Sequence, residues 1–516
     1  MPTLSLFHFL SLVSLILYLL YFLRIIITAV TTTATTTAAA TYGHKSYPFI
    51  GSLISFHQNS HRLIHWFTHL LSGSPSQTIV LRRLGRRKNQ MIVTANPANV
   101  EHILKTNFEN YPKGKPFTDL LGDFLGIGIF NVDGELWSTQ RKLASHEFST
   151  RSLREFTLSV VEELVTGRLV PLLEDAIEND GVLDMQDVLR RLAFDTICNI
   201  SLGWDPCCLD YSRPVPPLAA AFDAAAEASA IRGIAPAYWV WKAKRLFNLG
   251  SERRLKAAVA IVHRSVNEII QDRRQRQING CDTRLDLLSR FISAGHGDEL
   301  VRDMVISFLM AGRDTTSAAM TWLLWLLTWH PDVEKQILIE LTAITNDHDN
   351  SNLDHSSYHR SLNFEDLKKT DYLKACLCES MRLYPPVVWD SKHAGNDDVL
   401  PDGTPVFKGN RVMYFPYGMG RMEALWGKDC LEFRPDRWFV EPGVLKMESP
   451  YKFPVFQSGP RVCLGKEMAF VQMKCVVGSI LRRFELVPVC LDRPVFVPLL
   501  TAHMKGGFKV RVRRRN

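Results

Sequence analysis

The chain has 516 residues, of which 46% are hydrophobic, 22% charged and 10% aromatic. This composition is typical of a folded globular protein and excludes a disordered or low-complexity chain. The formal net charge is +8, from 61 lysines and arginines against 53 aspartates and glutamates. So small an excess, diluted over the whole chain, favours a membrane surface or an acidic protein partner, and we expect no nucleic-acid partner.

An apolar segment without formal charge occupies residues 4–23. Twenty helical residues at about 1.5 Å each span about 30 Å, the hydrocarbon thickness of a bilayer. Arg24 ends the segment and no basic residue precedes it, so the positive-inside rule leaves the rest of the protein in the cytosol. The alternative is a cleaved signal peptide, because residues 38–40 resemble an A-x-A site, but the apolar run is long for one and lacks a basic start. We therefore expect a single-pass anchor at 1–30, a linker at 31–46 and a folded domain at 47–516.

Hydrophobic periodicity predicts a mainly α fold with a smaller β part. The strand-like patterns fall at 77–81, 90–93, 484–489 and 507–512. The helical patterns between them fall at 152–174, 252–271, 300–330, 331–345 and 369–383. Two polar segments, 273–284 and 346–361, are expected to be loops.

The ten cysteines are irregularly spaced and include no C-x-x-C pair. This excludes the zinc-ribbon and thioredoxin-like interpretations and points to a reducing compartment. Most of the cysteines are expected to be inert, buried residues.

One cysteine stands out, in the motif Phe456-Gln-Ser-Gly459-Pro-Arg461-Val-Cys463-Leu-Gly465. A helix is expected to begin near Lys466, and a helix start lowers the pKa of a nearby thiol and so favours the thiolate. The glycines would let the backbone approach a flat ligand, and Arg461 could neutralise a carboxylate on it. A thiolate held in this way suits haem iron.

Two alternatives compete with that interpretation. A phosphate loop requires four residues between its glycines and Ser or Thr after the lysine, whereas five residues separate Gly459 from Gly465 and Glu467 follows Lys466. A buried structural cysteine is possible for any single thiol. A chance match to F-x-x-G-x-R-x-C-x-G has a probability on the order of 10⁻⁴, which favours the haem-thiolate interpretation.

With these residues the sequence resembles the cytochrome P450 superfamily, which implies that fold and haem b bound through Cys463. Glu379-Ser-Met-Arg382 resembles the E-x-x-R element of the superfamily, and Pro435-Asp436-Arg437-Trp438 resembles its P-E-R-F element, with Asp for Glu and Trp for Phe. The resemblance implies a charge network of Glu379, Arg382 and Arg437 that holds the fold around the haem.

The resemblance also assigns residues on both sides of the haem. Trp137 and Arg141, four apart and so on one helical face, match W-x-x-x-R and are implied to hold haem propionates together with Arg461. In the segment 311–316, Thr315 and Asp314 are implied to deliver protons during oxygen activation. Gly312 is expected to let the helix open locally against a distal ligand. The acid–alcohol pair favours monooxygenation over peroxide rearrangement.

Electrons are expected to come from another protein. Gly126-Ile127-Gly128 is not continued as G-x-G-x-x-G, and no nicotinamide or flavin fold is visible, so NADPH is expected to act through NADPH–cytochrome P450 reductase. Basic residues expected to lie near the Cys463 motif could dock an acidic reductase: Arg141, Lys142, Lys428, Lys452, Lys466 and Lys474.

The resemblance is closest to plant fatty-acid ω-hydroxylases, including those that act on jasmonoyl-amino acid conjugates. It is carried by the segments 138–148, 311–322, 387–404, 415–423 and 459–470. By position, the substrate pocket is expected to include the apolar residues Phe117, Leu121, Phe130, Phe308, Ala311, Val387, Val388, Trp389 and Leu500. The candidate cations for the substrate carboxylate are Lys392, Arg232 and Lys115. Ala311 stands where some animal relatives carry a Glu that esterifies the haem, so no covalent haem link is expected.

The expected protein is thus a haem-thiolate monooxygenase anchored in the endoplasmic reticulum membrane, with its catalytic domain on the cytosolic side. The expected reaction is hydroxylation near the methyl end of a carboxylate-bearing lipid. Jasmonoyl-isoleucine-type conjugates, hydroxylated at carbon 12 in jasmonate catabolism, are the first choice, and medium- or long-chain fatty acids the second. A non-catalytic haem sensor or carrier and a peroxide isomerase are remote alternatives.

Overall fold

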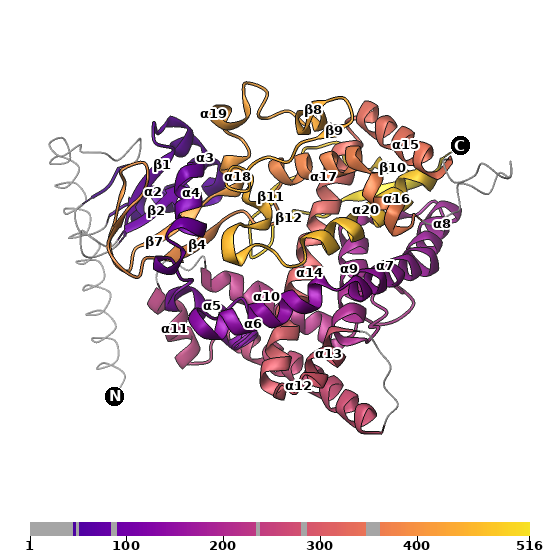
Figure 1. Ribbon diagram of the computed structural model, residues 1–516, viewed down its shortest axis with the longest axis horizontal. Coiled ribbons are helices and arrows are strands. Elements are labelled where there is room, and N and C mark those ends of the chain that lie inside the picture. Colours follow the sequence, from indigo (N-terminus) through magenta and orange to yellow (C-terminus); the bar gives the residue numbers. More distant parts are fainter. Residues whose placement is uncertain are drawn as a thin grey trace, which may run out of the picture.

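The computed structural model describes residues 45–47, 51–83, 90–233, 238–279, 286–346 and 362–515. Helices predominate in these ranges, with small sheets at one end and one side of the helical body (Figure 1). The mainly α prediction is confirmed. The predicted anchor, and the predicted linker up to residue 44, lie outside the described residues. Within the described ranges, no helix combines the length and the apolar character that crossing a bilayer would require.

The sheet at one end contains four strands in the order β1 (Thr78–Arg82), β2 (Gln90–Thr94), β7 (Arg411–Tyr414) and β4 (Asp390–His393). The two predicted strands, β1 and β2, pair antiparallel, whereas β2 pairs parallel with β7 from a distant part of the sequence. Short helices accompany this sheet: α2 (Leu53–Gln58), α3 (Leu63–Gly73), α4 (Pro97–Glu101), α18 (Pro416–Met419) and α19 (Glu423–Trp426). A separate apolar core with Ile79, Ile92 and Val412 at its centre holds this end together.

The helical body contains most of the protein. Its helices are α5 (Lys115–Leu125), α6 (Gly134–Ser149), α7 (Arg151–Leu164), α8 (Val170–Glu178), α9 (Met185–Leu202), α10 (Pro217–Gly233), α11 (Tyr238–Leu246), α12 (Ser251–Ile278), α13 (Leu287–Ser293), α14 (Asp298–Leu327), α15 (Pro331–Asn346), α16 (Phe364–Lys369), α17 (Asp371–Leu383) and α20 (Lys466–Arg483). A π-helical segment, Val165–Leu169, joins α7 to α8.

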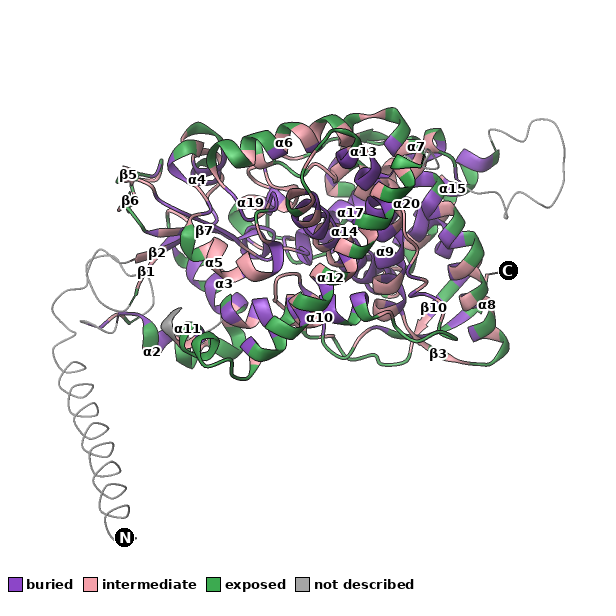
Figure 2. Ribbon diagram, turned by 90° about the horizontal axis from the view of Figure 1, so that it is seen from below, coloured by how far each residue is buried: buried purple, intermediate pink, exposed green. Residues whose placement is uncertain are grey.

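Helix α14 runs through the middle of this body and is buried over most of its length, with α9, α17 and α20 beside it (Figure 2). It is helical without a break from Asp298 to Leu327, so the predicted local opening at Gly312 is wrong. A Cβ at Gly312 would lie 2.5 Å from Cδ1 of Ile197 on α9. The glycine therefore allows two helices to approach each other closely.

The C-terminal strands lie along the helical body. Strand β10 (Phe484–Pro488) pairs with β13 (Lys509–Arg514), which also pairs with β3 (Val182–Asp184). The other strands form three short pairs: β5 (Asp398–Val399) with β6 (Pro405–Val406), β8 (Phe439–Glu441) with β9 (Val444–Leu445), and β11 (Phe496–Val497) with β12 (His503–Met504). The N–H of Ala502 donates to the carbonyl oxygen of Pro386 at 2.8 Å. This bond places the C-terminal hairpin beside the segment that follows α17.

One predicted loop, 273–284, is wrong in its first half because α12 continues to Ile278. Arg273 is buried there, and its guanidinium contacts the Asp286 carboxylate at 2.5 Å and the carbonyl oxygen of Leu202 at 2.8 Å. Its polar side chain thus ends inside the protein, where a loop was expected on the surface.

Candidate active site

The segment 456–465, here called the Cys loop, runs directly into α20 at Lys466, as predicted. The N–H of Cys463 donates to the carbonyl oxygen of Phe456 at 2.8 Å, which closes the loop. The Phe456 ring packs on Phe470 of α20, with 5.3 Å between ring centroids. These contacts hold the cysteine three residues before the start of a long helix.

The two glycines of the loop have different roles. Gly459 has φ +64°, and a Cβ there would lie 1.9 Å from the carbonyl oxygen of Leu104. Gly459 thus allows the loop to pack closely on the segment that contains Leu104. The close approach seen at this glycine is to the protein backbone, whereas the prediction was an approach to a flat ligand. At Gly465 a Cβ would meet Cys463 Sγ and Phe148 at 4.0 Å, so the space beside the sulfur is less constrained.

Cys463 is an exposed residue and forms no disulfide with any described residue. Burial of its sulfur among protein atoms raises the pKa of the thiol, although the N–H of Gly465 and the charges of Arg141 and Lys466 oppose this. The predicted lowering of this pKa is therefore wrong, because the loss of water outweighs the helix start. A metal ion would supply the missing stabilisation, since coordination deprotonates a thiol outright.

Cationic side chains gather beside Trp137. The Arg461 guanidinium lies 4.4 Å from the Trp137 ring centroid and donates to Asp133 Oδ1 at 2.7 Å. Arg141 is close enough to affect the pKa of both Arg461 and Cys463. The structure thus brings together the three residues that the resemblance assigned to the propionates.

Sequence reasoning missed a further cation of this cluster, Lys113. It is buried, its Nζ lies 4.3 Å from the Phe117 ring centroid, and burial lowers its pKa to about 8. The carboxylate facing it at 3.8 Å is Asp390. A single lysine between Pro112 and Gly114 offers no pattern from which this position could be predicted.

Asp390 is also the hydrogen-bond partner of Lys392. Its Oδ2 accepts from Lys392 at 3.0 Å, from Gln457 at 2.9 Å and from the Tyr414 hydroxyl at 3.2 Å. Burial alone would raise the pKa of Asp390, but Lys113 and Lys392 outweigh it and hold that pKa well below the usual range. The ammonium of Lys392 is thus already hydrogen-bonded to a carboxylate of the protein, so the prediction that it binds a substrate carboxylate is wrong.

The acid and alcohol of the predicted oxygen-activating pair lie on a partly exposed stripe of α14 with Met310 and Ala311, on an otherwise buried helix. The Thr315 hydroxyl donates to the carbonyl oxygen of Ala311 at 2.6 Å. The Asp314 carboxylate faces two guanidinium groups, Arg190 at 3.6 Å and Arg313 at 3.7 Å. The Asp314 side chain is 21% exposed and that of Arg190 is 41% exposed, so the carboxylate is accessible to solvent.

The predicted charge network is present. Arg382 donates to Glu379 through Nε and Nη2 at 2.8 Å each, and Arg437 Nε reaches the same carboxylate at 2.8 Å. Trp438, one of the two departures from the P-E-R-F element, donates its indole N–H to Glu379 at 3.0 Å. The carboxylate is thereby surrounded by donors.

The predicted pocket residues fall into two groups. Phe117 and Phe130 are partly exposed near α5, with Leu121 buried, while Val387, Trp389 and Leu500 are partly exposed near the C-terminal hairpin. Val388 is buried and accepts at its carbonyl oxygen from the N–H of Tyr417 at 3.3 Å. Phe308 does not fit a lining role, because its ring packs against Phe148 at 5.3 Å and Phe291 at 5.9 Å inside the core.

Both other candidate anchors for a substrate carboxylate are engaged elsewhere. Arg232 is buried and contacts Glu252 and Asp123 at 2.6 Å each, so the prediction that it anchors substrate is wrong. Lys115 is 81% exposed and pairs with Asp119 at 2.7 Å.

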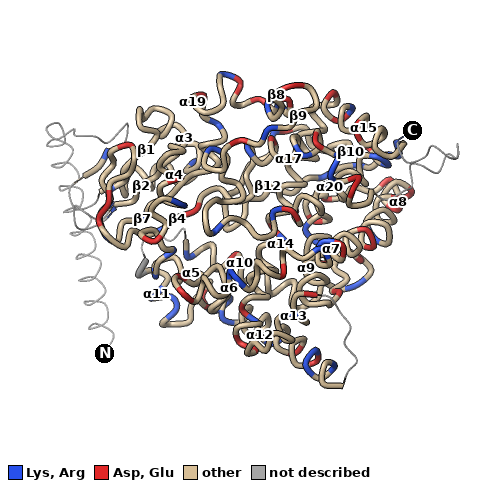
Figure 3. Tube along the Cα trace, viewed as in Figure 1, with Lys and Arg blue, Asp and Glu red and all other residues tan. Residues whose placement is uncertain are grey.

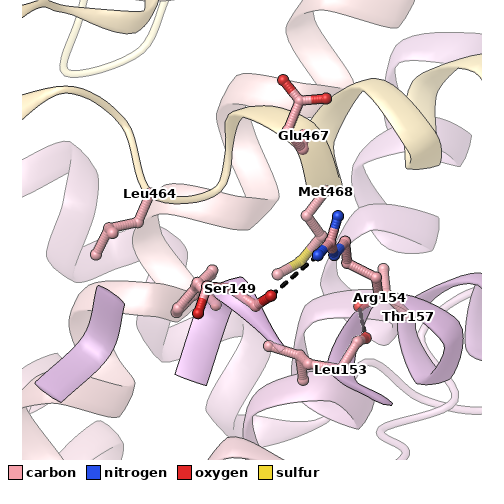
Figure 4. A pocket seen from close by; sticks show the side chains of 8 residues that line it. Ser149, Leu153, Arg154, Thr157, Leu464, Glu467 and Met468 are labelled. Carbon is pink, nitrogen blue, oxygen red and sulfur yellow. Dashed lines mark hydrogen bonds between the residues drawn. The ribbon is translucent and has the colours of Figure 1, made fainter. Parts of the chain in front are cut away.

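The surface beside the Cys loop is hollowed by a pocket of about 270 Å³ (Figure 4). It is lined by Phe148, Ser149, Leu153, Arg154, Thr157, Leu464, Glu467 and Met468. Basic and acidic positions are interspersed over the molecule (Figure 3). Of the predicted docking residues, Lys474 is buried and donates to the carbonyl oxygen of Leu367 at 2.9 Å, so it cannot belong to a docking surface.

The family model for cytochrome P450 matches residues 42–500. The chain belongs to the cytochrome P450 family. It is 61% identical over 478 residues to cytochrome P450 94B1 of Arabidopsis thaliana, and the match covers 91% of both proteins. It is 60% identical over 483 residues to cytochrome P450 94B3 of the same plant, and this match covers 92% of both. Cytochrome P450 94A1 of Vicia sativa is 46% identical over 483 residues, which cover 92% of this protein and 90% of that one.

As a cytochrome P450, the protein is a haem-thiolate monooxygenase whose haem iron is bound by a cysteine thiolate and whose electrons come from NADPH through a reductase. The described residues fit this cofactor. Cys463 is a free, exposed residue of the Cys loop, and Arg141, Arg461 and Lys113 form a cationic cluster suited to haem propionates. When bound, a haem with a thiolate ligand supplies the activation of dioxygen.

Proposed function

We propose that this cytochrome P450 hydroxylates the methyl end of a carboxylate-bearing lipid. The observation that carries monooxygenation is the Asp314–Thr315 pair on the partly exposed stripe of α14. A carboxyl and a hydroxyl at adjacent helical positions can hold and pass protons where a reacting group develops charge. Arg190, whose side chain is 41% exposed, lies 3.6 Å from Asp314, and the Asp314 side chain is itself 21% exposed, so protons can reach this pair from solvent.

In this proposal Cys463 is the iron ligand, and Phe456, Gly459 and Gly465 shape the loop that presents it. Trp137, Arg141 and Arg461 hold the propionates, and we add Lys113 to this set because it is buried within the same cationic cluster. Glu379, Arg382 and Arg437 keep the surrounding segments in place through their hydrogen bonds.

For the substrate we propose jasmonoyl-isoleucine-type conjugates first and free fatty acids second. Support comes from the sequence resemblance to plant ω-hydroxylases and from the apolar character of the partly exposed residues Phe117, Phe130, Val387 and Leu500. Terminal hydroxylation requires the acyl group to be held end-on, because internal C–H bonds are weaker and react first. None of Lys392, Arg232 and Lys115 suits the distant carboxylate.

We further propose that the protein is anchored in the endoplasmic reticulum membrane by residues 1–30, with its catalytic domain on the cytosolic side. The described surface supports contact with lipid. Leu246, Phe247 and Leu249 are 80%, 67% and 58% exposed at the end of α11, next to Lys244 and Arg245. Exposed apolar side chains beside basic ones are typical of segments that lie in a membrane interface. Fractionation of the full-length protein and of residues 31–516 tests the anchor, which is rejected if both stay soluble.

A competition assay tests the function. Membranes containing the full-length protein, a plant NADPH–cytochrome P450 reductase and NADPH receive jasmonoyl-isoleucine, dodecanoic acid and oleic acid together. Dominant 12-hydroxy-jasmonoyl-isoleucine supports the first choice, and dominant ω-hydroxy fatty acids support the second. Absence of any NADPH-dependent product from a haem-loaded protein contradicts the proposal and favours a haem sensor or carrier. Turnover of lipid hydroperoxides without NADPH favours an isomerase.

A further inference from the structure

The short segment Gly126-Ile127-Gly128, which fails as a nucleotide-binding motif, is pressed against α14. Gly126 ends α5 with φ +51°, and the N–H of Ile127 donates to Oδ2 of Asp303 at 2.9 Å. A Cβ at Gly126 would lie 1.9 Å from that same oxygen. At Gly128 it would lie 2.2 Å from Oγ of Ser307 and 2.4 Å from the carbonyl oxygen of Asp303. Both glycines are therefore required for this contact.

On the helix side, the contact is made by a fully buried carboxylate. Asp303 is 0% exposed, its Oδ1 accepts from Arg302 Nε at 2.8 Å, and its Oδ2 accepts from the loop. A buried charge is costly unless it is paired and hydrogen-bonded. Of these two hydrogen-bond partners, Arg302 lies on the same helix, whereas the N–H of Ile127 lies in the loop. What the carboxylate stabilises is the attachment of the loop.

The loop is fastened from its other side as well. The carbonyl oxygen of Ile127 accepts from Gln140 Nε2 of α6 at 2.7 Å, and that of Gly126 accepts from Asn131 Nδ2 at 2.9 Å. Ile127 thus has both its backbone groups bonded to neighbouring elements, while its side chain is 40% exposed.

The attachment lies on the face of α14 that bears the proton-delivering acid. Asp303, Ser307, Met310 and Asp314 follow at spacings of four, three and four residues, which places them on one side of the helix. Asp303 is about 16 Å along the axis from Asp314. The fastened segment connects α5, which carries Phe117 and Leu121, to Phe130, and these are the residues proposed to border the acyl group.

We propose that Asp303, Gly126, Ile127 and Gly128 form a latch that determines which carbon of the substrate is hydroxylated. The latch fixes the wall of Phe117, Leu121 and Phe130 relative to α14, and Asp303 acts as a positioning residue. The inference rests on the proposed function, because it requires an acyl group held end-on. A displacement of about 1 Å at a reacting atom changes a rate by about a hundredfold, so a loosened wall would admit the weaker internal C–H bonds.

Regiochemistry is the first test. Asp303→Ala, Asp303→Asn and Gly128→Ala are compared with wild type for the ratio of terminal to internal hydroxylation of dodecanoic acid. We expect the ratio to fall about tenfold for Asp303→Ala, as loss of a hydrogen bond to a charged acceptor implies. We expect a similar fall for Gly128→Ala, because its Cβ would collide with Ser307 and the Asp303 carbonyl oxygen and displace the loop from α14. The ratio should fall less for Asp303→Asn, since the amide oxygen of asparagine can still accept a hydrogen bond from the N–H of Ile127. The matched controls are Gly167→Ala, where a Cβ meets nothing within 4 Å, and Asp272→Ala, whose side chain is 59% exposed.

The second test does not depend on activity. Hydrogen exchange of residues 120–131 in the haem-loaded full-length protein should accelerate about tenfold at the Ile127 amide in Asp303→Ala and stay unchanged in both controls. Haem-loaded variants that keep the wild-type product ratio, or an Ile127 amide that exchanges as in wild type, would overturn the latch. If Asp303→Ala does not hold haem, Asp303→Asn and Gly128→Ala decide by the same criteria. If wild type makes no hydroxylated product, the proposed function fails, and the exchange result still decides the latch.

Discussion

Glu379 and Arg382 are joined by two parallel hydrogen bonds of 2.8 Å, one turn apart on α17, and neither side chain is accessible to solvent. Arg382 also donates to the carbonyl oxygens of Cys430 and Glu432 at 2.6 and 2.9 Å. The pair therefore ties the helix to a segment 50 residues further along. Removing Glu379 would leave the buried Arg382 charge without its carboxylate partner.

From this pair we predict that Glu379→Gln destabilises the protein by about 3–5 kcal/mol, the usual cost of breaking a buried ion pair. Thermal unfolding of the haem-loaded protein measures the loss. Glu155→Gln provides the control, because its pair with Arg151 is exposed and is worth at most about 0.5 kcal/mol. Equal losses in the two variants would contradict the role assigned to Glu379.

Gly459→Ala should reduce haem retention more than Gly443→Ala. Both glycines have positive φ, +64° and +81°, so both variants carry the same kind of backbone strain. Only at Gly459 does the new Cβ also meet an atom, the carbonyl oxygen of Leu104 at 1.9 Å. The fraction of protein with a reduced, CO-bound haem-thiolate spectrum gives the measurement. Equal haem retention in the two variants would mean that the contact between the new Cβ and Leu104 does not add to the effect of backbone strain.

Gly312→Ala should cost about 1–3 kcal/mol of stability, because its Cβ would lie 2.5 Å from Ile197 Cδ1 in a packed core. Ile197→Ala removes that atom, and the double variant should lose less than the two single variants combined. Denaturant unfolding of the four proteins completes the cycle. Additive losses would show that the two helices do not meet at this glycine.

Thr315→Ala should uncouple the reaction. Product formed per NADPH is expected to fall about tenfold or more, with hydrogen peroxide taking up the difference, because a proton donor is lost. Thr316→Ala is the matched control, since its hydroxyl donates to the carbonyl oxygen of Gly312 at 2.6 Å on the buried side of the same helix. Similar uncoupling in both variants would argue that helix bonding, and not proton delivery, is disturbed.

The buried Lys474 should make stability depend on alkaline pH. Burial lowers its pKa to about 8 from an ordinary 10.5, so the unfolded state binds more protons between these values. Stability relative to Lys474→Met should therefore rise as pH increases from 8 to 10.5, by up to about 3 kcal/mol. Urea unfolding of both proteins at pH 7.5, 8.5 and 9.5 measures this. A pH-independent difference would mean that the amine keeps its ordinary pKa in the folded state.

Elements whose signals lie close together in the sequence were predicted well, and elements that depend on distant segments were not. The long helix 300–330 and its neighbours 331–345 and 369–383 were predicted to within three residues, because their patterns and prolines are local. Helices α9 and α10 were not predicted. The first is buried on nearly all sides, and the second is rich in alanine and has no apolar stripe, so neither shows the periodicity of a half-exposed helix.

The residues of the candidate site also divide into those encoded by local motifs and those whose role depends on their partners in the fold. Cys463, the pair Glu379–Arg382 and the helical spacing of Trp137 and Arg141 are encoded within a few residues. The prediction that Lys392 and Arg232 bind the substrate carboxylate was wrong, because the sequence does not show which acidic residue a lysine or arginine will pair with. Lys392 is neutralised by Asp390 two residues away, and Arg232 by acids from two other helices.

The parallel pairing of β2 with β7 has a consequence for synthesis on the ribosome. Thr94 is in register with Tyr414, so 320 residues must be translated before β2 can acquire that neighbour. Until then the outer edge of β2 in the β1–β2 hairpin is unpaired, and an unpaired edge is a template for association with other polypeptides. The helical body can begin to form before β7 has been translated. Pairing of β2 with β7 is therefore expected to be a late, slow step of folding.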